Sequence, residues 1–103
     1  MSVIIGIDPH KLLHAACAID ERETELARLE VRANSRQVSD LLAWAAPFEC
    51  RSWAIESAGG LGYLLAQQLV ARGEHVVDVP ATLSSRVRLL GSGKSTKNDA
   101  NDA

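Results

Sequence analysis

The chain has 103 residues, 47% of them hydrophobic and 23% charged, which suits one small globular domain. Its formal net charge of −2 excludes a protein that binds nucleic acid through overall charge, so any basic surface must come from a local cluster. The sequence has no signal peptide and no apolar stretch of ~18 residues, which predicts a cytoplasmic protein without membrane contact. Cys17 and Cys50 have no CxxC partner, which is typical of two buried, reduced thiols.

The first predicted element is the apolar run of residues 3–7, which ends at Asp8 and Pro9. A short, continuous apolar run is typical of a strand that is buried on both faces, and proline cannot continue the pairing. The run therefore places the Asp8 carboxylate at the edge of a sheet, where ligands of α/β folds usually bind.

Two more strands are predicted before the first helix. Residues 14–19 read as a second strand, and the polar residues 20–24 have the length of a hairpin loop. In residues 27–32 apolar and charged side chains alternate, which is the pattern of a strand with one solvated face. The three strands are predicted to form an antiparallel meander with the third at or near the edge.

The next elements alternate between helix and strand. Asn34 is predicted to cap a helix that ends before Pro47, with Gln37 completing a variant capping box. Residues 52–56 form a short apolar strand that ends, like the first, in a carboxylate, Glu56. The apolar positions of the helix between Asn34 and Pro47 are Val38, Leu41, Leu42 and Ala45.

A second helix and a fifth strand follow. Glycines 59, 60 and 62 are predicted to form a turn, either a simple one or one that lets the backbone pass close to Glu56 and a phosphate. The helix stops at Gly73, and residues 75–79 form the last strand before Pro80. The apolar positions of this second helix are Leu61, Leu64, Leu65 and Leu69.

The element order β-β-β-α-β-α-β predicts an α/β fold of the RNase H-like class, with a mixed sheet of five strands and helices on its faces. Residues 1–103 form one domain in this interpretation. A final helix begins at Ser95 or Thr96 and stops at the end of the sequence, which predicts that the chain is a fragment of a longer protein.

Four carboxylates are predicted to converge. Asp8 and Glu56 end strands that are neighbours in this topology, and Asp99 and Asp102 lie three residues apart on one helical face. Such a cluster is stable only when cations neutralise it, and hard oxygen ligands select Mg²⁺ or Mn²⁺. Each acid on its own could equally be a solvated surface carboxylate, and the last two could complement the helix dipole.

Three motifs carry a resemblance to a known family: residues 6–11 (GIDPHK), 54–59 (AIESAG) and 97–103 (KNDANDA). In this order they resemble the motifs of the DEDD transposases, insertion-sequence recombinases related to the Piv DNA invertases. The N-terminal domain of that family is similar to the RuvC Holliday-junction resolvase. Its four catalytic, metal-binding acids fall on Asp8, Glu56, Asp99 and Asp102.

The resemblance implies an RNase H-like fold, divalent metal, and DNA cleavage and strand transfer at element ends and target during transposition. Some members of the family are directed by a structured RNA that the element encodes, and we expect the full-length protein to be a homo-oligomer. The family continues into a C-terminal transposase domain with a nucleophilic serine, which has no counterpart among these residues. Residues 1–103 are therefore expected to be the N-terminal catalytic domain.

A basic segment is the candidate for phosphate contacts. Residues 84–98 contain four positive charges and no acid, and Lys11 follows the first strand; beside a metal site, such side chains hold phosphate without reading bases. The segment GSGKST at residues 91–96 is no P-loop, since the glycine five positions before Gly93 is replaced by Arg88. The predicted nucleic-acid contacts are Lys11, Arg86, Arg88, Lys94 and Lys97.

Two other functions remain open at this stage. One is a nucleic-acid-binding remnant of a transposase without catalysis, because the last helix lacks the residues that would pack it. The other is an actin-like or sugar-kinase-like ATP-binding half-domain, which would need a glycine loop after Asp8 where residues 9–11 are Pro-His-Lys.

Overall fold

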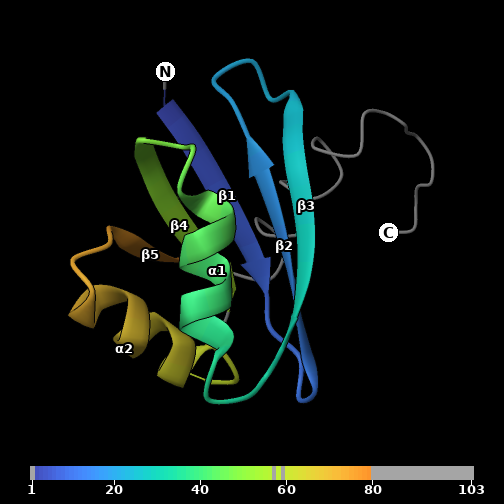
Figure 1. Cartoon of the computed structure of the whole chain (residues 1–103), viewed down its shortest axis with the longest axis vertical. Coiled ribbons are helices and arrows are strands. Elements are labelled where there is room, and N and C mark those ends of the chain that lie inside the picture. The colour runs from blue at the N-terminus through green and yellow to red at the C-terminus, as the bar shows by residue number, and fades with distance from the viewer. Residues whose placement is uncertain (1, 57, 59, 80–103) are drawn as a thin grey trace.

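The computed structural model describes residues 2–56, 58 and 60–79. Its elements follow the predicted order, and both helices lie on one side of a twisted sheet (Figure 1). No helix within these residues is long and apolar enough to cross a membrane. The elements are β1 (Ser2–Asp8), β2 (Leu13–Ile19), β3 (Glu25–Arg32), α1 (Gln37–Ala45), β4 (Cys50–Glu56), α2 (Tyr63–Ala71) and β5 (Val76–Val79).

The five strands form one mixed sheet in the order β3-β2-β1-β4-β5. β1 pairs antiparallel with β2 and parallel with β4, while β3 and β5 are the edges of the sheet. This confirms the predicted meander, with the alternating strand β3 at an edge. The continuous apolar run of β1 takes the central position.

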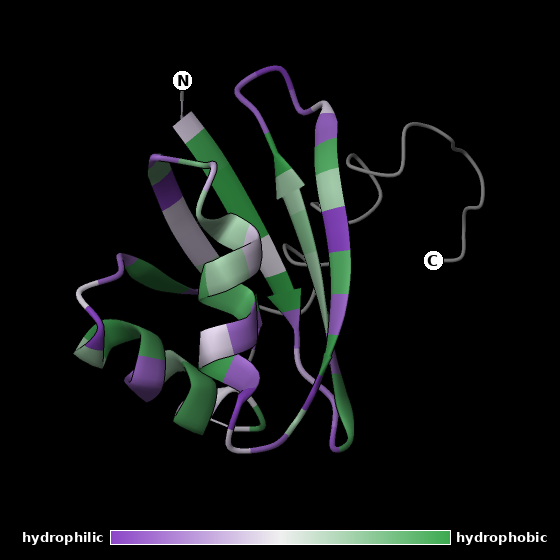
Figure 2. Ribbon diagram, in the orientation of Figure 1, coloured by the Kyte–Doolittle hydropathy of each residue, from purple (hydrophilic) through white to green (hydrophobic). Residues whose placement is uncertain are grey.

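The hydrophobic core lies between the sheet and the two helices. Ile5 and Ile7 of β1 are fully buried, as are Trp53 and Ile55 of β4, and these alternate residues face the helices. Figure 2 shows the same division: the central strands are apolar, and β3 alternates between hydrophilic and hydrophobic residues. The helices contribute Val38, Leu41, Ala45, Leu65, Ala66 and Leu69 to the core.

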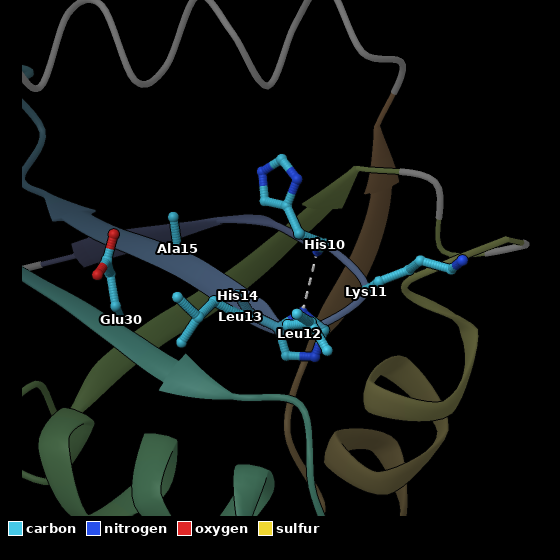
Figure 3. A pocket seen from close by; sticks show the side chains of 7 residues that line it. All are labelled: His10, Lys11, Leu12, Leu13, His14, Ala15 and Glu30. Carbon is cyan, nitrogen blue, oxygen red and sulfur yellow. Dashed lines mark hydrogen bonds between the residues drawn. The ribbon is translucent and has the colours of Figure 1, made fainter.

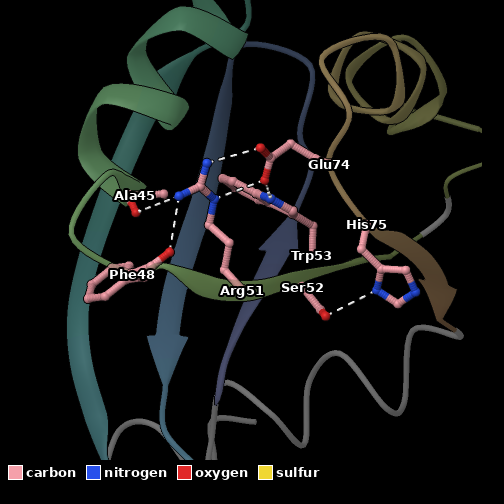
Figure 4. A network of polar contacts seen from close by, with 7 residues as sticks. All are labelled: Ala45, Phe48, Arg51, Ser52, Trp53, Glu74 and His75. Carbon is pink, nitrogen blue, oxygen red and sulfur yellow. Dashed lines mark hydrogen bonds and ion pairs between the residues drawn. The ribbon is translucent and has the colours of Figure 1, made fainter. Parts of the chain in front are cut away.

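A polar network joins the end of α1 to the loop before β5 (Figure 4). The Arg51 guanidinium makes two hydrogen bonds of 2.9 Å to the Glu74 carboxylate and also donates to the carbonyl oxygens of Ala45 and Phe48. The indole N–H of Trp53 donates to Glu74 at 2.7 Å. The Arg51 hydrogen bond, opposed by desolvation and aided by the Trp53 bond, lowers the pKa of Glu74.

The predicted capping box at the start of α1 is wrong. The Asn34 side chain accepts a hydrogen bond from the Arg36 N–H, two residues on, and no side chain caps the helix. Gln37 does not fold back on the helix start, because its side chain is buried and hydrogen-bonded to other elements.

Two predictions about burial also need correction. Leu61 and Leu64 are 59% and 61% exposed, so only the other two predicted leucines of this segment face the core. Both cysteines are free thiols, but only Cys17 is buried, because Cys50 lies at the exposed first position of β4.

Candidate active site

Two carboxylates meet where β1 and β4 end. The parallel register pairs Ile7 with Ile55, so Asp8 and Glu56, one residue further on, lie at the same level on adjacent strands. Because Ile7 and Ile55 face the helices, the next residue of each strand faces the opposite side of the sheet. Adjacent strands are about 4.8 Å apart, so the two acids lie side by side on one face, as predicted.

The Asp8 side chain and one oxygen of the Glu56 carboxylate are shielded from water. The Asp8 side chain is 15% exposed, and the Oε1 atom of Glu56 is inaccessible to solvent. His10, which is mostly exposed, places Nε2 3.2 Å from Oδ2 of Asp8. Two carboxylates at neighbouring positions on one face of the sheet repel each other, and a bound cation would relieve this repulsion.

The beginning of α2 packs tightly against both strand ends. A Cβ atom added to Gly62 would lie 2.7 Å from Cγ2 of Ile55, 3.1 Å from the carbonyl oxygen of Glu56 and 3.2 Å from Cγ of Pro9. Gly62 has an ordinary negative φ of −88°, so it is needed for space and not for its backbone conformation. Of the two readings for this glycine turn, the close approach to Glu56 is the one observed.

A buried chain of hydrogen bonds supports the loop after Asp8. The backbone N–H of His10 donates to Nδ1 of His14 at 3.4 Å, as drawn in Figure 3. Since Nδ1 accepts, the ring proton is on Nε2, which donates to Oε1 of Gln37 at 2.9 Å. The Gln37 amide then donates to Gln68 at 2.7 Å. The loop is thereby connected to both helices.

Sequence reasoning missed this chain. One signal for the buried chain was present, because Gln37 precedes Leu41 and Ala45 at helical spacing and is a polar residue on the buried face. Its partners lie 23 and 31 residues away, and no local pattern identifies them.

The remaining predicted site residues lie outside the described part of the chain, namely Asp99, Asp102, Arg86, Arg88, Lys94 and Lys97. The same is true of the predicted last helix and of the segment at residues 91–96. Lys11 is described and exposed in the loop after β1. Within residues 2–56, 58 and 60–79, no three or more His, Cys, Asp or Glu side chains group closely enough to hold a metal ion.

A mixed sheet in the order 3-2-1-4-5, with acids at the adjacent ends of its two central parallel strands, defines the RNase H-like class to which RuvC belongs. Solved structures agree with this fold. The large terminase nuclease from thermophilic phage G20c superposes with a TM-score of 0.63 at 16% identity, covering 85% of this chain and 53% of that one. RuvC of T. thermophilus, in complex with a Holliday junction substrate, gives 0.61 at 18% identity, covering 80% and 66%.

Sequence comparison identifies the family. Residues 5–103 match the DEDD IS110 transposase family, and the chain belongs to it. It is also 35% identical, over 99 residues, to an uncharacterized 44.8 kDa protein of insertion element IS116 from Streptomyces clavuligerus. The match covers 96% of this chain and 25% of that protein, so the chain spans about a quarter of its relative's length.

Proposed function

We propose that this chain is the N-terminal catalytic domain of the transposase, and that it cleaves and transfers DNA strands with divalent metal. The observation that carries the proposal is the position of Asp8 and Glu56, at one level and on one face of two adjacent parallel strands. The family membership supports it, because residues 5–103, which include both acids, match that family.

The donor set of the site fits a hard cation. Asp8 and Glu56 offer only carboxylate oxygens, which suit Mg²⁺ or Mn²⁺ better than softer metals. Two acids are too few for a closed site, and we assign the other ligands to Asp99 and Asp102. Divalent ions bound in such a site would activate the attacking oxygen and stabilise the leaving oxygen at the phosphate.

The chain's own residues act by holding these groups in place. Buried Ile7 and Ile55 fix the level of the two acids, and His10 orients the Asp8 carboxylate through its contact with Oδ2. The predicted basic residues, from Lys11 to the cluster at 86–97, would hold the DNA backbone on the same side. A guide RNA and a homo-oligomeric full-length protein stay predictions.

The test compares Asp8→Asn, Glu56→Gln and the matched variant Glu49→Gln in the full-length protein. Glu49 is exposed in the loop before β4, and its replacement by Gln makes the same chemical change on the same stretch of chain. The first two variants should lose at least ~10³-fold in the Mg²⁺-dependent cleavage of element-end DNA. Calorimetry should show weaker Mg²⁺ binding for both variants, while the control behaves as the wild type.

Two results would contradict this assignment. Wild-type cleavage by Glu56→Gln would remove that residue from the site. DNA binding without any metal-dependent cleavage, in the wild type as in the variants, would favour the non-catalytic alternative.

A further inference from the structure

A groove of about 500 Å³ lies beside the candidate active site and is formed by three segments. These segments are the loop after β1, the loop before α1 and the beginning of α2. The first two are held together by a 2.8 Å hydrogen bond from the Ala33 N–H to the Leu12 carbonyl. His10 lines the groove and its imidazole contacts Asp8, so this residue connects the groove to the candidate metal-binding carboxylate.

The lining of this groove is suited to a polyanion. Lys11 is exposed in it and extends toward the segment that leads into α2 (Figure 3), and the described residues of the lining include no Asp or Glu. Neighbouring hollows differ, because the one lined by Leu12 and Leu13 contains Glu30, and the one between β3 and α1 contains Glu30 and Asp40. The absence of a carboxylate therefore distinguishes this groove from the hollows beside it.

Both apolar and polar groups line the groove. Leu61 and Leu64, at the start of α2, line the groove and are more than half exposed to solvent. The lining also includes the exposed side chains of Asn34 and Ser35, an amide and a hydroxyl. An apolar wall, hydrogen-bonding groups and one cation match the sugar, base edge and phosphate of a nucleotide.

We propose that this groove binds a single-stranded nucleotide of the DNA next to the bond that is cleaved. The inference deepens the proposed function and depends on it, since the strand whose phosphate lies at Asp8 continues past His10 into the groove. The sugar and base lie against Leu61 and Leu64, the base edge faces Asn34 and Ser35, and Lys11 contacts a phosphate.

The first experiment introduces a negative charge into the groove, with a matched control on the same helix. Leu64→Glu places a carboxylate in the groove, and Val70→Glu places one on α2 outside its lining, at a residue that is 55% exposed. We measure binding of the full-length protein to fluorescent element-end DNA with a single-stranded flank, in EDTA, so that no cleavage occurs. Leu64→Glu should bind about tenfold more weakly, and Val70→Glu within twofold of the wild type.

The second experiment isolates the phosphate contact. Lys11→Gln should reduce the slope of log K against log salt concentration by about 0.7, the value for one phosphate of a single strand. Arg22→Gln is the control, because Arg22 is exposed in the hairpin at the other end of the sheet. Lys11→Arg should restore the slope.

The outcomes separate this inference from the proposed function. If Leu64→Glu binds DNA as the wild type does, or if only RNA binding is weakened, the inference is wrong. A change in oligomeric mass with unchanged DNA binding would mean that the groove receives another protein chain. None of these results depends on cleavage, whereas both results that would contradict the proposed function are read from cleavage.

Discussion

Replacing Gly62 with Ala should disturb both the core and the candidate active site. The added methyl group would lie 2.7 Å from Cγ2 of Ile55, well inside the 3.4 Å at which ordinary contact begins. Ile55 is fully buried in β4 and branched at Cβ, so its methyl group has no free space in which to turn. Relief must come from moving the start of α2 away from β4 by most of an ångström.

The cost follows from this overpacking. Forcing an extra methyl group into a close-packed core lowers the free energy of unfolding by about 1–3 kcal/mol. The same movement disturbs the packing of α2 against the Glu56 carbonyl oxygen and Cγ of Pro9, the two other atoms close to the added methyl group. Both atoms lie where β1 and β4 end and bring the two acids together. Cleavage should therefore fall by more than the loss of folded protein explains.

A second glycine, just after the C-terminal end of α2, provides the control. Gly73 has φ = +83° and nothing within 4 Å of an added Cβ, so Gly73→Ala strains the backbone without a clash, at about 1–2 kcal/mol. Thermal denaturation and DNA cleavage are measured on both full-length variants at a temperature where each is folded. Both should be less stable, and only Gly62→Ala should cleave slowly; equal cleavage rates would refute the reasoning.

Three further predictions test the polar groups and thiols. Arg51→Met should destabilise the protein by about 2–4 kcal/mol in urea denaturation, because Glu74 is only 14% exposed and loses its guanidinium. Because the pKa of Glu74 is lowered in the folded protein, its ionised carboxylate stabilises the fold fully above about pH 4.3, and this stabilisation is lost as the pH falls through the lowered pKa. The free energy of unfolding of Arg51→Met should therefore depend less on pH in acid. Gln37→Leu should cost about 1–3 kcal/mol by leaving buried partners without hydrogen bonds, and an unchanged denaturation midpoint would contradict this. A thiol reagent should label Cys50 but not Cys17 in the native protein, because burial raises the pKa of Cys17 to about 11; mass spectrometry reads the result.

The topology could be predicted because each strand carries its own signal. The continuous apolar run before Asp8 indicates a central strand, and the alternation around Glu30 indicates an edge, as observed. The spacing of leucines was less informative in α2, where Leu61 and Leu64 fit an apolar pattern but face away from the core. Which side of such a helix is buried depends on the sheet, and the sheet is assembled from residues distant in sequence.

The candidate site divides in the same way. A carboxylate at the end of a strand can be recognised locally, and two such strands in this topology must end together, so Asp8 and Glu56 were predictable. The groups that hold the neighbouring loop were not, because the His14–Gln37–Gln68 chain joins one strand to two helices. Such hydrogen bonds join residues far apart in the sequence, and their only local sign in the sequence is a polar residue on an apolar helix face.

The pairing of the two acids is a consequence of the hydrophobic core. Ile7 and Ile55 lie opposite each other and are both buried against the helices, and each acid is the next residue in its strand. A slip of one residue in either strand would turn one isoleucine out of the core and one carboxylate into it. The burial of these two side chains, at about 1.5–3 kcal/mol each, is therefore what keeps the carboxylates on one face. A one-residue deletion within β1 should abolish metal binding even where the sheet still forms, because it places Asp8 and Glu56 on opposite sides.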